Sequence, residues 1–238
     1  MNSTATPLPA GCESVPSREV AARNAVRAAD AAFNITGVSA PTGLHYSWTW
    51  RASPACAVHF VHMNLFGGRA GCGSAGTPGK EGTYPCTDSW IWPEDSLGFL
   101  EADLAAHAGP GVLVVTLQHY GFDGWSNTWY NADQRVDMWR VLSKYNTLAA
   151  FVGHTHSAMA YSFNGTDGGD FGSTAPGFID VVNAPATQKE DGQFNALPSE
   201  FMAAELALDA TGKAGTFRVA QRVGSGWGKI QASKKVTC

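Results

Sequence analysis

Apolar residues follow two strand-like patterns along the first two thirds of the chain. Residues 44–50 and 57–65 are rich in aromatic and β-branched side chains, so each is predicted to form a strand. The short connection between them indicates a hairpin or a meander. Residues 111–117 form a continuous apolar run, which is typical of a central strand buried on both faces. A further apolar run of strand length, residues 148–152, ends in the sequence Gly-His-Thr-His.

Helical periodicity separates these runs. Pro93 and the acidic residues after it begin a predicted helix that ends at Gly109 and has three leucines on its apolar face, Leu97, Leu100 and Leu104. A second predicted helix begins at Asn131 and carries an apolar face formed by Met138, Val141, Leu142 and Tyr145. The order of strand, helix and strand over residues 111–156 is typical of a parallel crossover in an α/β protein.

The pattern differs at the two ends of the chain. Residues 1–43 are predicted to be an irregular N-terminal segment with one helix, which begins at Ser17. Residues 66–93 form a long glycine-containing loop. Beyond His156, turns rich in Gly, Asp and Asn separate four predicted strands, which favours a β-meander over residues 158–163, 177–182, 200–208 and 215–221. No linker interrupts residues 44–238, so they are taken as one domain.

Composition excludes several classes of protein. Of the 238 residues, 44% are hydrophobic and 15% are charged, which is typical of a folded globular chain. The net charge is -4 and there is no basic block, so no nucleic-acid partner is expected. No apolar run reaches the roughly 18 residues that a transmembrane helix needs.

Several weaker features favour a secreted or luminal glycoprotein. Glycosylation tripeptides begin at Asn2, Asn34 and Asn164, although no signal peptide is visible. Among the five cysteines, Cys72 and Cys86 share one loop and are the best candidates for a disulfide, with free thiols as the alternative.

Three histidines follow the two apolar strands of the crossover. His119 comes after the first strand, and His154 and His156 come after the second. Ligands in open α/β sheets bind at the carboxyl ends of strands. In an extended segment, positions i and i+2 point the same way, so His154 and His156 are expected to project together. This arrangement predicts a site for Zn, Fe or Mn.

In this order, these elements resemble the calcineurin-like metallophosphoesterases. That family ends its catalytic domain with a strand leading into a lone histidine, a helix, and a strand leading into Gly-His-x-His. Here these are His119 and residues 153–156. The strands at 44–48 and 58–61 and the helix at 92–104 are similar to the segment after the family's Gly-Asn-His-Asp/Glu motif. The resemblance covers most of residues 43–221.

The resemblance implies an α/β sandwich of two mixed β-sheets flanked by helices. It also implies a metal-dependent phosphoric ester hydrolase that acts on a phosphomonoester or phosphodiester with two divalent ions. His119 and His154 would bind one ion and His156 the other. A bridging hydroxide would attack the phosphorus.

The family's remaining ligands are not found in this sequence. They come from Asp-x-His, Gly-Asp-x-x-Asp and Gly-Asn-His-Asp/Glu, and none of these motifs occurs here. The chain is therefore expected to be the C-terminal part of such a domain, a fragment without the N-terminal strand–helix units. At most partial metal occupancy and negligible activity on an aryl phosphate are expected. The alternative is a non-catalytic binding module with the same fold.

Other candidate residues have competing interpretations. His45, His59 and His62 are predicted to be histidines of the sheet face or core edge rather than ligands. Asp123 either orients His119 through its carboxylate or is a simple N-cap or solvated side chain, and the second interpretation is favoured. The aromatic loop 122–130 either lines a substrate mouth or packs over the next helix.

Overall fold

The computed structural model describes residues 35–38, 45–69, 95–126, 130–185 and 200–238. The helix predicted at Ser17, most of the loop at 66–93 and the cysteines Cys72 and Cys86 lie outside these ranges. None of the described helices is long and apolar enough to cross a membrane.

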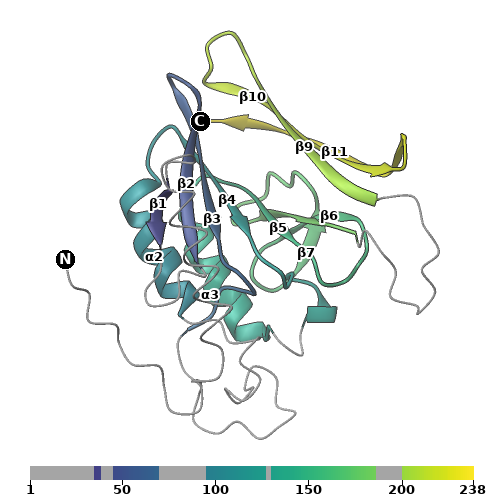
Figure 1. Cartoon of the computed structure of the whole chain (residues 1–238), viewed down its shortest axis with the longest axis horizontal. Helices are drawn as coiled ribbons and strands as arrows, with labels where there is room; N and C mark the ends of the chain where they lie inside the picture. The colour runs from purple at the N-terminus through teal and green to yellow at the C-terminus, as the bar shows by residue number, and fades with distance from the viewer. Residues whose placement is uncertain (1–34, 39–44, 70–94, 127–129, 186–199) are drawn as a thin grey trace, which may run out of the picture.

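A mixed sheet of eight strands forms the centre of the protein (Figure 1). Its four central strands are parallel to one another: β3 (Cys56–His62), β4 (Val112–Leu117), β5 (Thr147–Val152) and β8 (Ile179–Asn183). Four further strands flank them, and each pairs antiparallel with its neighbour in the sheet. They are β1 (Ile35–Val38), β2 (Tyr46–Ser53), β6 (Met159–Phe163) and β7 (Gly168–Asp170). The carboxyl ends of the four parallel strands therefore meet at one edge.

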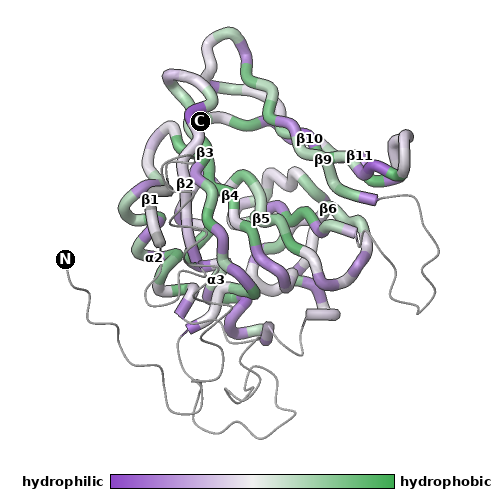
Figure 2. The backbone as a smooth tube through the Cα atoms, viewed as in Figure 1, coloured by the Kyte–Doolittle hydropathy of each residue, from purple (hydrophilic) through white to green (hydrophobic). Residues whose placement is uncertain are grey.

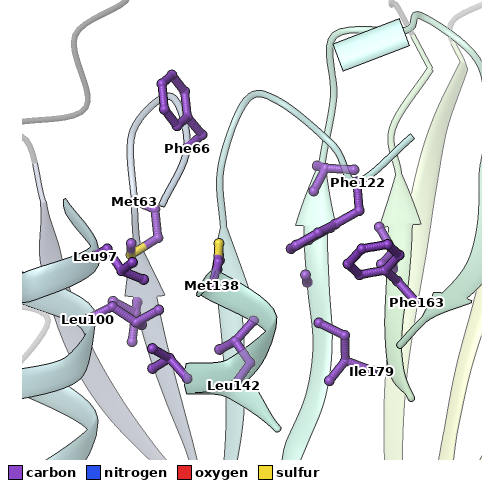
Figure 3. Packing of buried hydrophobic residues seen from close by; sticks show 14 of the residues in the cluster. Met63, Phe66, Leu97, Leu100, Phe122, Met138, Leu142, Phe163 and Ile179 are labelled. Atoms are coloured by element: carbon purple, nitrogen blue, oxygen red, sulfur yellow. The ribbon is translucent and has the colours of Figure 1, made fainter. Parts of the chain in front are cut away.

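Two helices pack on one face of this sheet. They are α2 (Ser96–His107) and α3 (Ala132–Leu142). Figure 3 shows Leu97 and Leu100 of α2 near Met63, and Met138 and Leu142 of α3 in the same apolar layer. The predicted apolar faces are confirmed for their leucines, Met138 and Val141, which are buried, whereas Tyr145 lies beyond the end of α3 and is half-buried. The crossover from β4 through α3 to the adjacent parallel strand β5 is confirmed as well.

A separate antiparallel sheet covers the other face. It contains β9 (Glu200–Leu208), β10 (Ala214–Val223) and β11 (Gly226–Thr237) in consecutive order. Its Phe217, Val219 and Val236 pack against apolar residues of β3, β4 and β5. Figure 2 shows the central strands as largely hydrophobic and β11 as more hydrophilic. The described layers are thus helices, the mixed sheet and the antiparallel sheet.

The observed architecture agrees with a mixed α/β class but differs from three expectations. The second sheet is antiparallel rather than mixed, and both described helices lie on one face of the central sheet. The strands after His156 do not form one meander, because β8 inserts between β5 and β6 while β9 to β11 pair among themselves. Strand β11 was not predicted, because Ala232 and Lys234 stand between Ile230 and Val236 on its inward side and interrupt the apolar alternation.

A disulfide joins Cys56, the first residue of β3, to Cys238. Their Cα atoms are 5.3 Å apart, although 182 positions separate them in the sequence. This pairing was not anticipated, because proximity along the chain favoured Cys72 and Cys86. The bond ties the end of the antiparallel sheet to the central sheet.

Candidate metal centre

Three chain segments meet at the carboxyl edge of the parallel strands, and backbone hydrogen bonds join them. The amide of His119, just after β4, donates to the carbonyl of Asn64 at 2.9 Å. The amide of Gly153, just after β5, donates to the carbonyl of His119 at 2.9 Å. These bonds extend the parallel pairing beyond the strands, so the segments after β3, β4 and β5 are held side by side.

The rings of His119 and His154 meet at this edge. The Nδ1 atom of His154 lies 3.3 Å from the Nε2 atom of His119, and the ring planes are inclined by 70°. If the two rings are ligands of one ion, as the resemblance implies, their nitrogens are expected about 3–5 Å apart, and the observed separation lies in this range. Two nitrogens bound to one tetrahedral ion at bond lengths of about 2.0–2.1 Å would lie about 3.3–3.4 Å apart. The pair therefore fits two ligand positions of one divalent ion, and the same distance suits a proton shared between neutral rings.

The turn after β5 is not extended, which corrects the reasoning that placed His154 and His156 on one side. Both residues have left-handed backbone angles, with φ of 71° and 56°, and the amide of Thr155 donates to the carbonyl of Gly153. A left-handed non-glycine residue costs roughly 1–2 kcal/mol. Asn64, at the end of β3, is left-handed as well, with φ of 57°. Such outliers are typical of functional sites, where the surroundings hold the strained backbone in place.

His156 lies beside the pair rather than completing it. Its side chain is exposed in the turn. Within the described residues, no group of three or more His, Cys, Asp or Glu side chains is arranged to hold a metal ion. The structure thus brings the rings of His119 and His154 together, with His156 outside this contact. Metal binding by His119, His154 and His156 stays a prediction.

Electrostatics favour the neutral form of both rings. Burial is the main cause that lowers the pKa of His119, and the nearby rings of His154 and His156 lower it further. Burial also lowers the pKa of His154, against an opposite effect from Asp123, and His156 adds to the lowering. Each imidazole therefore stays neutral to a lower pH than a free histidine, and neutral imidazole is the form that binds metal.

One hollow borders His119, and a second is lined by neither histidine of the pair. One, of about 360 Å³, adjoins the ends of β3, β4 and β5 and is lined mainly by His62, Asn64, Gln118, His119 and Gly153. The other, of about 510 Å³, is more apolar and is lined by residues that include Phe122, Asp123, Met159, Tyr161 and Phe163. Both have the size of small-molecule sites.

The other histidine candidates behave as structural residues. His59 is fully buried, and its ring bonds to Asp103 at 2.6 Å and to Thr49 at 2.8 Å. His45 is buried beside Phe99. His62 stacks on Tyr46 and also borders the smaller hollow. The prediction that His59 is a satisfied core histidine is confirmed.

Some residues of the aromatic loop 122–130 lie in the core and others lie on the surface. Phe122 and Tyr130 are buried, whereas Trp125 is 79% exposed. One carboxylate oxygen of Asp123 accepts hydrogen bonds from the amides of Trp125 and Ser126. The interpretation of Asp123 as an N-cap is confirmed.

One neighbour of the histidine pair was overlooked in the sequence. Tyr120 is buried, and its ring lies edge-on to both histidines, with centroids 4.7 Å from His119 and 4.6 Å from His154. Its position directly after His119 is the signal that could have identified it. The packed ring restricts rotation of both imidazoles.

No family model matches the sequence, and no curated protein matches it. Among solved structures, the chain is similar to a dimetal phosphatase from Danio rerio, with 14% sequence identity and a TM-score of 0.43. The match covers 81% of this chain and 60% of that one, so the chain spans less than two thirds of the phosphatase's length. This similarity does not define a family or an activity for the chain.

Proposed function

We propose that the chain is a domain of a metal-dependent phosphoric ester hydrolase in which His119 and His154 bind one divalent cation. The observation that carries the proposal is the separation of 3.3 Å between their ring nitrogens at the carboxyl edge of the parallel sheet. The order of strand, histidine, helix, strand and Gly-His-x-His supports it independently. The substrate class is a phosphomonoester or phosphodiester.

The protein's own residues supply binding and orientation at this site. His119 and His154 each offer a neutral ring nitrogen, and Tyr120 restricts both rings. A bound divalent ion would polarise a phosphoryl oxygen and lower the pKa of bound water. The smaller hollow beside His119 leaves room for a ligand at the same edge.

A second candidate is a non-catalytic binding module. Within the described ranges, no group of three or more His, Cys, Asp or Glu side chains is arranged to hold a metal ion, which favours this module. The sequence also contains no Gly-Asn-His or Asp-x-His motif that would bring further ligands. Such a module would bind a metal ion or a phosphate ester without turning it over.

Metal binding can be tested by calorimetric titration of the chelator-treated protein with Zn²⁺. We expect one ion per chain, with affinity at least about tenfold weaker in His119→Ala and in His154→Ala. His107→Ala is the matched control, because His107 lies at the end of α2 beside His59 and outside the pair. Equal affinity in the wild type and both pair variants would contradict the proposed site.

Turnover separates the two candidates. With Mn²⁺ and an aryl phosphate monoester or diester, we expect hydrolysis by this chain to be near background, because the carboxylate ligands of the resembled family are absent. Robust hydrolysis that disappears in His154→Ala would establish the hydrolase and refute this expectation of low activity. Weak hydrolysis that stays above background and is lost in His154→Ala would support the hydrolase, whereas Zn²⁺ binding with no hydrolysis above background of either ester would favour the binding module.

A further inference from the structure

Asn183 lies directly behind the turn that carries His154 and His156. It is the last residue of β8, is fully buried, and pairs in register with Val152 at the end of β5. Its side-chain nitrogen donates to the hydroxyl of Thr155 at 2.6 Å and to the carbonyl of Ser157. The two acceptors flank His156, so one buried amide holds the turn on both sides of that residue.

The orientation of this amide follows from its acceptors. A backbone carbonyl accepts hydrogen bonds and cannot donate, so the nitrogen of Asn183 must face Ser157. Its oxygen is buried and has no hydrogen-bond partner among the described residues. The two shortest hydrogen bonds of the amide nitrogen therefore go to the turn, and its contact with the carbonyl of Ala184 is longer, at 3.4 Å.

The turn depends on such external bonds. His154 and His156 both have left-handed backbone angles, and the hydrogen bonds that the described residues make within the turn are Thr155 to Gly153 and a long one, 3.3 Å, from the Ser157 hydroxyl to the carbonyl of Thr155. Strained backbone persists where the surroundings over-determine it. The backbone of Ala184 adds a bond to Val152, which fixes the base of the turn rather than its tip.

We propose that Asn183 is a positioning residue that holds the turn 153–157 and thereby sets the ring of His154 against His119. It touches neither a metal ion nor a substrate. Its relevance to metal affinity rests on the proposed function, whereas its effect on the turn does not. Residues that orient metal ligands typically contribute about 10–100-fold to affinity.

Two measurements test this role. In Asn183→Ala we expect Zn²⁺ affinity to fall about tenfold and amide hydrogen exchange at residues 154–157 to accelerate about tenfold relative to residues 149–151 of β5. Asn183→Asp keeps the shape but removes the amide donors, so it should behave like the alanine variant. Asn146→Ala is the matched control, because its amide also donates to a carbonyl, that of Thr237, but at the opposite end of β5.

Thr155→Val provides a variant that leaves β8 intact. It removes one of the two acceptors, so exchange at residues 154–157 should rise by a smaller factor than in Asn183→Ala. If the Asn183 variants do not fold, this variant decides the question. Unchanged exchange in the turn in every folded variant would overturn the positioning role. If exchange in the turn accelerates in the Asn183 variants but the wild-type protein does not bind Zn²⁺, the positioning role of Asn183 stands and only the metal site is refuted.

Discussion

At the scale of single residues, a buried carboxylate joins α2 to the central sheet. Asp103 of α2 accepts a hydrogen bond from Ser47 of β2 at 2.6 Å and bonds to the Nε2 atom of His59 of β3 at 2.6 Å. The other ring nitrogen of His59 bonds to Thr49 at 2.8 Å. Because all of these groups are largely withdrawn from water, removing the carboxylate leaves polar partners that water cannot reach.

Asp103→Ala should therefore destabilise the protein strongly. We expect the free energy of unfolding to fall by about 3 kcal/mol, because two buried hydrogen-bonding groups lose their partner. Urea unfolding followed by circular dichroism measures this change. Glu101→Ala on the same helix is the control: its pair with Arg69 is exposed, and the expected loss is less than about 1 kcal/mol. Similar losses in both variants would show that the buried cluster has no special role.

The sequence predicts the meeting of His119 and His154 but not the conformation of the turn. Adjacent parallel strands place the residues after them at one edge, so the pairing follows from a local strand–helix–strand pattern. The left-handed angles at His154 and His156 depend on Asn183, which is 29 and 27 positions away and belongs to a different strand. Periodicity within a segment carries no information about such a contact.

At the scale of elements, α3 connects the two adjacent parallel strands that lead into His119 and His154. Its first turn is closed by a capping box, in which the Asn131 side chain accepts from the amide of Gln134 and the Gln134 side chain accepts from the amide of Asn131. The cap explains why the helix begins where the sequence predicts. Arg135, near this end, donates to the carbonyls of Phe122 and Asp123 and so connects the helix to the loop after β4.

Loss of the cap should be measurable. Asn131→Ala is expected to lower the free energy of unfolding by about 1 kcal/mol, because an amide of the first turn loses its acceptor. Arg140→Ala tests the same helix at an exposed pair with Asp137, and its expected effect is less than about 0.5 kcal/mol. Thermal or urea unfolding compares the two. A larger loss in Arg140→Ala would contradict the importance of the cap.

Elements with a strong local pattern could be predicted, whereas their assembly could not. The strands β3, β4 and β5 and the helices α2 and α3 have clear apolar periodicity. The insertion of β8 between β5 and β6 and the separate sheet of β9 to β11 arise from pairing between distant segments. Nothing within the sequence of β8 distinguishes its parallel partner β5 from its antiparallel partner β6.

At the scale of the whole molecule, the antiparallel sheet is fastened to the central sheet by three kinds of contact. Phe217 and Val219 pack in the apolar layer between the sheets. Lys234 donates to the carbonyl of Leu148 at 2.6 Å and pairs with Asp180 at 2.5 Å. The Cys56–Cys238 bond closes the end of this interface.

Breaking that disulfide should lower stability without removing the histidine pair. In the double variant Cys56→Ser/Cys238→Ser, we expect a loss of about 2–4 kcal/mol in the free energy of unfolding, because the unfolded chain gains freedom over a long loop. Urea unfolding gives the value. Zn²⁺ affinity should stay unchanged, since the bond lies at the opposite end of β3 from His62. An unchanged midpoint relative to the wild type would contradict a stabilising role for this bond.

The long separation of Cys56 and Cys238 along the chain also affects the order in which disulfides can form during synthesis. At a synthesis rate of about 5–20 residues per second, Cys56 leaves the ribosome roughly 10–40 seconds before its partner. Cys72 and Cys86 emerge during that interval and are the nearer candidates for pairing. The native bond must therefore form after these closer thiols have become available. The rate of oxidative folding is therefore expected to depend on how fast an early disulfide between Cys56 and a nearer cysteine is exchanged for the native bond.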